Sequence, residues 1–194
     1  ETDHDVYVSP AQIRRFNLKT GDIVTGNTKV KTEREKFSAL LYLKEVNGLA
    51  PDANAKRPNF EDLTPIFPNE RIRLERDGGS MAVRIVDEIA PIGKGQRGMI
   101  VSPPKAGKTV LLKKIANAIS ENYPEIKLIL LLIDERPEEV TDMRESVKGD
   151  VISSTFDEMP EKHIKVSEMV FERAKRLVEH GNDCLLYTSP SPRD

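Results

Sequence analysis

The clearest chemical pattern in this sequence is the stretch Ser102-Pro-Pro-Lys-Ala-Gly-Lys-Thr109. It follows the apolar run Met99–Val101, which predicts a strand, and it precedes a segment that predicts a helix. In this context the backbone N–H groups of residues 106–109 can surround phosphates, because the first turn of a helix has unpaired donors and the positive end of its dipole. The Lys108 ammonium would reach the β- and γ-phosphates, and the Thr109 hydroxyl would bind Mg²⁺.

One position departs from the usual phosphate-binding loop, because Ser102 stands where a leading glycine is expected. The alternative is a glycine-containing loop that only happens to end in Lys-Thr. We favour the phosphate-binding interpretation because the expected strand precedes the loop and the expected helix follows it.

A pair of acids follows the longest apolar run, Leu128–Ile133. A carboxylate at the carboxyl end of a buried parallel strand faces the ligand crevice. From the motif alone, Asp134 would hold Mg²⁺ and Glu135 would polarise the attacking water. The other interpretation makes both acids N-terminal charges of the next helix, where Pro137 and the two glutamates after it also suit the helix dipole.

A second glycine pattern, Gly93-Lys-Gly-Gln-Arg-Gly98, satisfies the spacing of the dinucleotide fingerprint GxGxxG. That fingerprint functions only after a strand and at the start of a helix, whereas this segment precedes the expected strand at Met99. The segment therefore predicts either a flexible turn or backbone that lies close to a nucleotide.

The order of expected elements indicates two kinds of architecture. Residues 1–45 have the short strands and turns of an all-β domain, and residues 46–75 contain four prolines, which indicates an extended connector. Beyond residue 97, strands and helices alternate, which predicts a parallel sheet covered by helices. The expected strands are 99–101, 128–133 and 151–156, and the expected helices are 107–122, 137–147 and 161–180.

Composition narrows the choice of partners. The 194 residues carry a net charge of −2, which argues against a polycation that binds nucleic acid by charge alone. Residues 14–44 nevertheless have eight Lys or Arg against three acids, and Tyr7 and Phe37 could stack on bases, although both rings could equally belong to the core. The single cysteine and the shortness of every apolar run predict a cytoplasmic protein without a membrane span.

Several segments together resemble the Rho family of bacterial transcription termination factors. The resemblance extends over about residues 3–183 and implies an α/β fold: an incomplete RecA-like, parallel-sheet phosphate-loop ATPase domain preceded by part of an all-β, cold-shock-like oligonucleotide-binding barrel. We expect the partial barrel at 1–45, a connector at 46–75 and the partial ATPase domain at 76–183. The segments that carry the resemblance are Tyr7–Leu18, Thr20–Asp22, Gly93–Gly98, Pro103–Thr109, Leu131–Thr141, Ser154–Glu158 and Ala174–His180.

The resemblance also implies roles for individual residues. Glu135 would activate the attacking water, so that Asp134 would not be the Walker B acid, which in this family ends a strand after Asp183. Lys108 would be catalytic, and Thr109 would bind the metal. The residues lining the ATP site would be Gly93, Lys94, Gly95, Gln96, Arg97, Gly98, Lys105, Ala106, Gly107, Lys108, Thr109, Val110 and Arg136. The RNA contacts would be Asp5, Val6, Tyr7, Glu35, Lys36 and Phe37, with Arg14 and Arg15 nearby.

For the whole protein the resemblance implies an ATP- and Mg²⁺-dependent translocase or helicase. It would form a ring-shaped homo-hexamer, bind single-stranded pyrimidine-rich RNA and dislodge the RNA polymerase elongation complex. Two alternatives stay open. One is another hexameric RecA-like ATPase, such as a rotary ATPase subunit, and the other is an RNA-binding module with a vestigial nucleotide site.

The final segment, Cys184–Asp194, departs from the family pattern. Pro190 and Pro192 lie too close together for a central strand, so we expect residues 184–194 to be a non-native tail. Without a Walker B acid and an arginine finger, the chain alone is expected not to hydrolyse ATP, and its sheet is expected to expose apolar faces.

Overall fold

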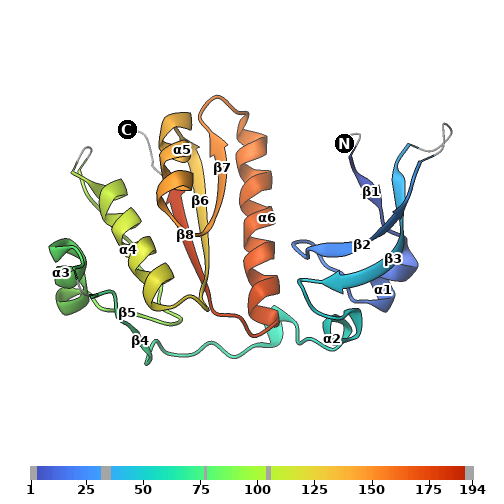
Figure 1. The fold of residues 1–194 in the computed structure, drawn as a ribbon, viewed down its shortest axis with the longest axis horizontal. Helices are drawn as coiled ribbons and strands as arrows, with labels where there is room; N and C mark the ends of the chain where they lie inside the picture. Colours follow the sequence, from blue (N-terminus) through green and yellow to red (C-terminus); the bar gives the residue numbers. More distant parts are fainter. Residues whose placement is uncertain (1–3, 32–35, 77, 104–105, 191–194) are drawn as a thin grey trace. The chain divides into compact units, whose positions relative to one another are not determined.

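The computed structural model describes residues 4–31, 36–76, 78–103 and 106–190. These residues form two compact units (Figure 1). The first unit contains the chain up to Asp62 together with Phe171–Gly181, and the second contains Leu63–Val170 with the residues from Asn182 onward. The division between the two units therefore falls within one helix, α6 (Pro160–Glu179).

The first unit is built around a small sheet. Its elements are β1 (Val6–Tyr7), α1 (Pro10–Arg15), β2 (Val24–Lys29), β3 (Ser38–Val46), α2 (Pro51–Ala55) and the 3₁₀ turn η1 (Phe60–Asp62). The strands lie in the order β1-β3-β2, with β1 parallel and β2 antiparallel to β3. Leu40, Leu43 and Val46 on β3 form the core of this unit.

Local sequence explains why α1 begins at Pro10. The Ser9 hydroxyl accepts a hydrogen bond from the Gln12 backbone N–H, and the Gln12 side chain accepts one from the Ser9 N–H, both at 3.2 Å. This capping box satisfies two donors that the start of a helix otherwise leaves unpaired, and Pro10 suits the first helical position.

The second unit contains a parallel sheet with helices. Its elements are β4 (Arg71–Ile72), α3 (Met81–Ile89), β5 (Ile92–Gly93), α4 (Lys108–Asn122), β6 (Lys127–Glu135), α5 (Pro137–Ser146), β7 (Asp150–Thr155), the first part of α6 and β8 (Cys184–Pro190). The main sheet has the order β7-β6-β8 with both pairings parallel, and β4 pairs with β5 in a separate antiparallel ribbon. The predicted α/β class with a parallel sheet is confirmed.

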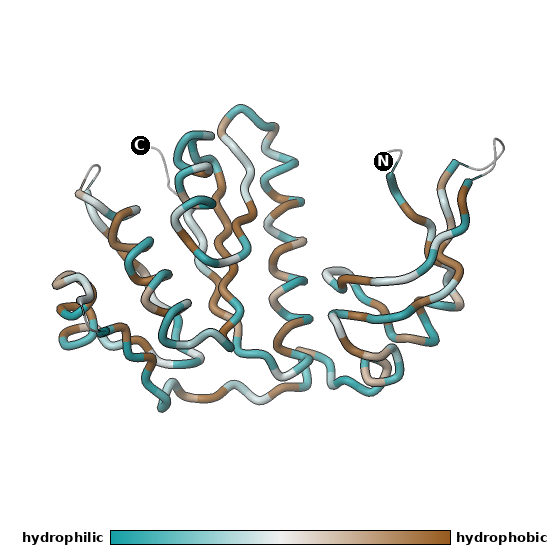
Figure 2. Tube along the Cα trace, viewed as in Figure 1, coloured by the Kyte–Doolittle hydropathy of each residue, from teal (hydrophilic) through white to brown (hydrophobic). Residues whose placement is uncertain are grey.

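The central strand β6 is hydrophobic along most of its length, as Figure 2 shows by its brown trace. Alternate residues Leu128, Leu130 and Leu132 pack with α4 and α5 in one buried cluster. Ile129 and Leu131, which point to the opposite face, are buried as well. Burial on both faces explains why this strand is a continuous apolar run rather than an alternating one.

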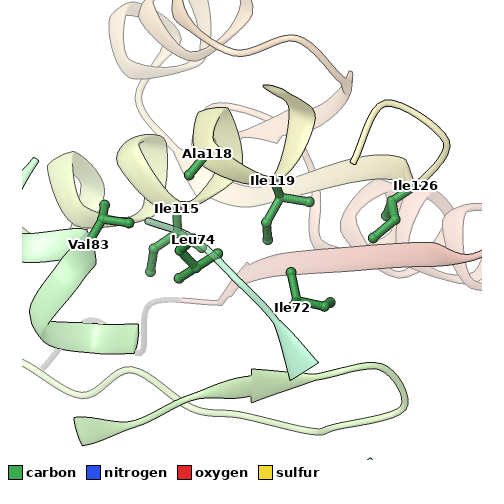
Figure 3. Close-up of a cluster of buried hydrophobic side chains, with 7 residues drawn as sticks. All are labelled: Ile72, Leu74, Val83, Ile115, Ala118, Ile119 and Ile126. Carbon is green, nitrogen blue, oxygen red and sulfur yellow. The ribbon is translucent and has the colours of Figure 1, made fainter. Parts of the chain in front are cut away.

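A second core cluster fixes α4 from its other side (Figure 3). Ile115, Ala118 and Ile119 of α4 contact residues from the segment before β5, together with Ile126 just before β6. Because the glycine-lysine-threonine motif forms the N-cap and the first two residues of α4, this packing fixes the position of the motif.

Two expectations from sequence differ from the structure. Met99–Val101 forms no strand, and Met99 is 86% exposed. This run is only three residues long and lies between Gly98 and Pro103, so it offers few N–H groups to a ladder. Residues 184–190, expected not to form a strand, instead form β8 beside β6. In the described sheet β8 lies at the edge and Pro190 is its last residue, a position that proline tolerates.

The boundaries 1–45, 46–75, 76–183 and 184–194 stay predictions. Among the described residues, no helix is both long enough and apolar enough to cross a membrane.

Candidate nucleotide-binding and RNA-binding sites

The glycine-lysine-threonine motif forms the start of α4. Gly107 precedes the helix with a φ of 88°, a left-handed conformation that favours glycine, and a β-carbon there would meet no atom of the described residues within 4 Å. Lys108 and Thr109 are the first residues of α4, where backbone N–H groups lack helical acceptors. The Ser102 hydroxyl is buried and has no hydrogen-bond partner among the residues that the structure describes. Open space, orphan donors and a lysine at a helix N-terminus fit a nucleotide phosphate.

Helix packing brings this motif to the same edge of the sheet as Glu135. The Lys113 ammonium pairs with Asp142, and the Asn117 side chain donates to the Ser146 carbonyl oxygen at 2.8 Å, so α4 and α5 run in the same direction. Lys108 begins α4 and Pro137 begins α5, and the distance in sequence from Lys108 to Lys113 equals that from Pro137 to Asp142. The two helices therefore begin at the same level, and α5 begins just after β6. The start of α4 therefore lies level with the carboxyl end of β6, as Figure 1 shows.

The two acids at the end of β6 have different backbone conformations. Asp134 has a φ of 59°, and the pairing with β7 shifts between Ile133 and Glu135. Such an irregularity turns the strand end and redirects its side chains. Glu135 is half-buried and accepts a hydrogen bond from the Ser189 hydroxyl at 2.5 Å. Arg136, also predicted to contact nucleotide, is exposed at the N-cap of α5.

A third carboxylate adds negative charge beside Glu135. Burial raises the pKa of Glu139, and the neighbouring charge of Glu135 raises it further. This edge of the sheet therefore combines a cationic loop with clustered acids, the composition expected where a phosphate and an attacking water meet.

The segment Gly93–Gly98 begins near the opposite end of the sheet from Glu135. The Lys94 ammonium lies 2.8 Å from Asp183 and 2.7 Å from Glu70. The contact with Asp183 raises the pKa of Lys94 most, and the contact with Glu70 raises it further. Asp183 precedes β8, and its carbonyl oxygen accepts a hydrogen bond from Lys127 at the start of β6. At about 3.3 Å per residue, β6 separates this end from Glu135 by roughly 26 Å.

The structure therefore does not bring Lys94 together with Lys108. Gly93 packs closely instead, because a β-carbon there would lie 2.7 Å from the Pro68 carbonyl oxygen. Gln96 closes the turn by accepting from the Gly93 N–H at 2.8 Å. Arg97, Gly98 and Val110 are exposed, and Ala106 is exposed beside Gly107. Lys105 lies outside the described residues.

The predicted RNA contacts gather at one end of the first unit's sheet. Val6 pairs with Ser38 and Tyr7 with Ala39, which places Tyr7 close to Phe37 along the adjacent strand. Tyr7 is 54% exposed. The Lys36 ammonium lies 5.0 Å from the centre of the Phe37 ring. Asp5 is exposed, and Glu35 lies outside the described residues.

The two arginines of α1 are also exposed. The Arg14 side chain donates to the Pro10 carbonyl oxygen at 3.3 Å, and the Arg15 guanidinium lies 5.1 Å from the centre of the Phe16 ring. The exposed Tyr7 and the partly buried Phe37, with cations nearby, form a surface suited to stacked bases and phosphates.

An exposed tyrosine that sequence analysis did not single out lies on the same sheet. Tyr42 and Leu41 line a shallow groove of about 400 Å³ together with Arg15 and Pro51. Tyr42 lies two residues after Leu40, so regular alternation along the strand would have placed its ring in the core beside Leu40. Register shifts between β2 and β3 break this alternation.

No group of three or more His, Cys, Asp or Glu side chains that could hold a metal occurs in the part of the chain that the structure describes.

Comparison with known proteins identifies both units. Residues 1–52 match the family model described as Rho termination factor, RNA-binding domain. Residues 82–189 match the model described as ATP synthase alpha/beta family, nucleotide-binding domain.

Among curated proteins, the chain is similar to proteins named transcription termination factor Rho. It is 56% identical over 187 residues to the protein from Aquifex aeolicus, covering 94% of this chain and 43% of that one. It is 54% identical over 185 residues to the Bacillus subtilis protein, covering 95% of this chain and 43% of that one. It is 55% identical over 185 residues to the Haemophilus influenzae protein, with 94% and 44% covered.

The chain thus spans less than half the length of these relatives. Both domains are matched, and the identity extends over nearly all of this sequence. The chain therefore belongs to the family of transcription termination factor Rho, and its residues 82–189 belong to the nucleotide-binding domain of the ATP synthase alpha/beta family.

Proposed function

We propose that this chain provides RNA-binding and nucleotide-binding parts of an RNA-dependent ATPase that translocates along RNA and terminates transcription. The observation that carries the proposal is the shared edge of the sheet, where Lys108 and Thr109 begin α4 level with Glu135. The similarity to proteins named transcription termination factor Rho supports the same assignment.

In this mechanism the backbone N–H groups at the start of α4 bind the phosphates of ATP, and Lys108 neutralises charge on the transferred phosphoryl group. Thr109 supplies a hydroxyl ligand to Mg²⁺, which would supply further charge neutralisation when bound. Glu135 accepts a proton from the attacking water as the water oxygen bonds to phosphorus and the bond to the leaving phosphate oxygen breaks. Arg136 and the predicted ATP contacts from Lys105 to Val110 are proposed to bind the nucleotide.

On the first unit, Tyr7 and Phe37 are proposed to stack on bases of single-stranded, pyrimidine-rich RNA, with Lys36, Arg14 and Arg15 near its phosphates. We further propose that the whole protein is a cytoplasmic homo-hexamer that acts on the RNA polymerase elongation complex. Oligomeric state, this partner and localisation rest on the family alone.

Two substitutions in the whole protein test the nucleotide site. Lys108→Ala should abolish ATP hydrolysis, because it removes the cation nearest the proposed phosphate. Glu135→Gln should leave nucleotide binding within about twofold and slow hydrolysis by ~10² to 10⁴-fold, since the amide cannot accept the proton. Glu138→Gln, the same change at an exposed position of α5, is the matched control and should hydrolyse normally.

The measurement is the rate of phosphate release with and without pyrimidine-rich RNA, alongside nucleotide affinity. Near-normal turnover in Lys108→Ala would remove the proposed site. Hydrolysis that RNA does not stimulate would favour another RecA-like ATPase, and nucleotide binding without hydrolysis in the unsubstituted protein would favour an RNA-binding module.

A further inference from the structure

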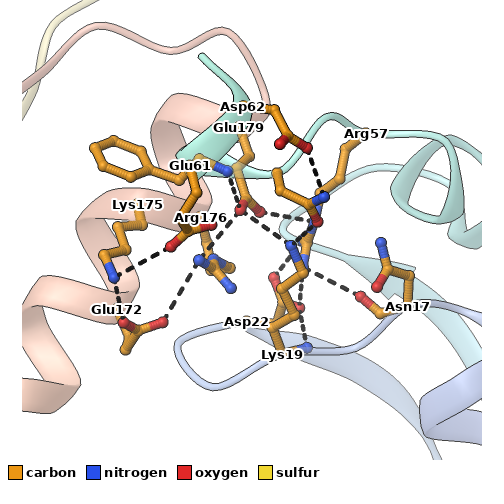
Figure 4. Close-up of polar contacts among 12 residues, drawn as sticks. Asn17, Lys19, Asp22, Arg57, Glu61, Asp62, Glu172, Lys175, Arg176 and Glu179 are labelled. Atoms are coloured by element: carbon orange, nitrogen blue, oxygen red, sulfur yellow. Dashed lines mark hydrogen bonds and ion pairs between the residues drawn. The ribbon is translucent and has the colours of Figure 1, made fainter.

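A buried cluster of charged residues in the first unit has Arg57 at its centre (Figure 4). The Arg57 side chain is 2% exposed, and its Nη1 and Nη2 atoms donate to the two carboxylate oxygens of Asp22 at 2.6 and 2.8 Å. Its Nε atom lies 2.9 Å from Glu179 Oε2, a contact of opposite charges without hydrogen-bond alignment. Arg57 therefore joins the loop before β2 to the last residue of α6.

Glu179 connects a further segment to this cluster. Its side chain is fully buried, and its Oε1 atom accepts from the Phe60 N–H at 2.9 Å and lies 3.2 Å from the Lys19 ammonium. Arg176 Nη2 approaches the same oxygen at 3.1 Å. Buried charges are tolerated only with such close partners, so each partner fixes the position of the end of α6.

Backbone packing beside this cluster is equally tight. Gly21 has a φ of +90°, and a β-carbon there would lie 2.5 Å from the Glu172 carbonyl carbon. The backbone of the loop before β2 therefore rests directly on α6. Together with the charged cluster, this contact makes the last turns of α6 an integral part of the RNA-binding unit.

The other end of α6 is held by a different hydrogen-bonded group in the second unit. The fully buried Ser154 hydroxyl on β7 lies 2.5 Å from Glu158 Oε2 and 2.7 Å from His163 Nδ1. A hydroxyl has one proton, so Ser154 donates to the Glu158 carboxylate and accepts from the imidazole N–H. These bonds join the end of β7, the following turn and the first turn of α6.

That turn also contacts the proposed catalytic acid. Thr155 pairs with Glu135 in the sheet, and the Phe156 N–H donates to the Glu135 carbonyl oxygen at 3.3 Å. A displacement of the first turn of α6 would therefore be transmitted to the backbone of Glu135 through two residues of β7 and its turn.

We propose that α6 couples the RNA-binding unit to Glu135, with Glu179 and Ser154 as positioning residues at its two ends. This inference rests on the proposed function, because it assigns a route by which RNA occupancy regulates the nucleotide site. A continuous helix suits this role, since its backbone hydrogen bonds make its turns cooperative. Coupling of this kind is reciprocal: RNA changes nucleotide affinity by the same factor as nucleotide changes RNA affinity.

The experiment measures this factor in the whole protein. The affinity for a pyrimidine oligonucleotide is measured with and without a saturating, non-hydrolysable ATP analogue. We expect a factor within the usual range for coupled sites, about 5 to 150. Glu179→Gln and Ser154→Ala should each reduce it to below about 2. The matched control Glu168→Gln, at an exposed position of the same helix, should retain the factor.

A double variant separates coupling from simple damage. If both residues act through α6, Glu179→Gln combined with Ser154→Ala should reduce the factor no further than either change alone. If Glu179→Gln does not fold, as judged by its thermal unfolding, Ala174→Gly gives the same information, because glycine weakens the helix between its ends without removing a charged contact.

The outcomes distinguish this inference from the proposed function. Unchanged coupling in Ser154→Ala together with unchanged coupling in Glu179→Gln, or in Ala174→Gly where Glu179→Gln does not fold, overturns the role of α6. Binding of both ligands with a factor of 1 in the unsubstituted protein overturns it as well while leaving the proposed function intact. Failure of the protein to bind nucleotide or RNA at all contradicts the proposed function itself.

Discussion

At the scale of a single residue, Tyr7 is the aromatic side chain that we propose contacts RNA. This residue is more than half exposed on the two-residue strand β1. Stacking of a base on such a ring is worth ~1–3 kcal/mol. Its exposure and its closeness to Phe37 are therefore consistent with contact with RNA.

Replacing this ring gives the first prediction at the residue scale. Tyr7→Ala should weaken binding of single-stranded RNA by ~1–3 kcal/mol, whereas Tyr7→Phe, which keeps the ring, should bind within about twofold. Arg14→Ala should mainly reduce the dependence of affinity on salt, because a lost phosphate contact releases one counterion fewer. Titrations at several salt concentrations measure both effects. Full affinity in a folded Tyr7→Ala variant would exclude the ring from the RNA surface.

At the scale of the element, α4 carries the phosphate-binding motif and depends on tertiary packing for its position. Lys108 and Thr109 lie at its start, and Ile115 and Ile119 lie on the face that packs into the cluster of Figure 3. Most helical stability in a protein comes from such packing rather than from intrinsic propensity. The site and the core cluster are therefore coupled through this helix.

Truncating the core of α4 tests that dependence. Ile119→Ala should destabilise the chain by about 2–5 kcal/mol, because Ile119 is fully buried and the smaller side chain leaves a cavity. Ile89→Ala, the same change at a residue of α3 that is 79% exposed, should alter the free energy of unfolding by less than about 0.5 kcal/mol. Urea unfolding measures both values. Equal stability of the two variants would contradict the assignment of this core.

At the scale of the whole molecule, the buried cluster around Arg57 should make stability depend on pH. Burial, and after it the charge of Arg57, lowers the pKa of His180 below its ordinary value of 6.5. Its Nε2 atom lies 3.0 Å from the Asn47 side-chain nitrogen and 3.2 Å from Arg57 Nη1, two donors that require a neutral, accepting imidazole.

The second titrating group in this cluster is Asp22. Burial alone would raise its pKa, but hydrogen bonds from Arg57, the Lys19 backbone N–H and Asn47 outweigh burial and hold the pKa below its ordinary 3.8. Each group has a lower pKa in the folded chain than in the unfolded chain. In the window between these two values of the same group, the unfolded chain binds more protons than the folded chain. Stability is therefore present above that window and is lost as the pH falls.

The resulting prediction concerns acid unfolding. The free energy of unfolding should decrease as the pH falls below 6.5 and decrease again below about 3.8. His180→Gln should remove the first decrease, because glutamine accepts a hydrogen bond without titrating, and the exposed His4→Gln should not. Urea unfolding at a series of pH values, followed by circular dichroism, measures this. A decrease of equal size in His180→Gln would assign the first window to another group.

Local sequence determined much of this protein. The apolar run Leu128–Ile133 predicted β6, and the segments after it predicted α5, β7 and α6 closely, because burial in a parallel sheet requires such runs and helices require their own periodicity. The motif ending in Lys108 and Thr109 predicted a loop that opens a helix, since the chemistry of that loop is contained in adjacent residues.

Only the tertiary structure decided which distant residues meet. Met99–Val101 is apolar but pairs with no strand in the described part of the chain. Lys94, which belongs to a glycine pattern near the loop in sequence, pairs with Glu70 and Asp183 at the far end of β6. The contact of Arg57 with Glu179 joins segments 122 residues apart, to which no local pattern points. Short-range periodicity indicates which face of each segment is buried, but the packing of the whole chain determines which segments contact one another. This packing places the start of α4 at the same edge as Glu135 and holds the two ends of α6.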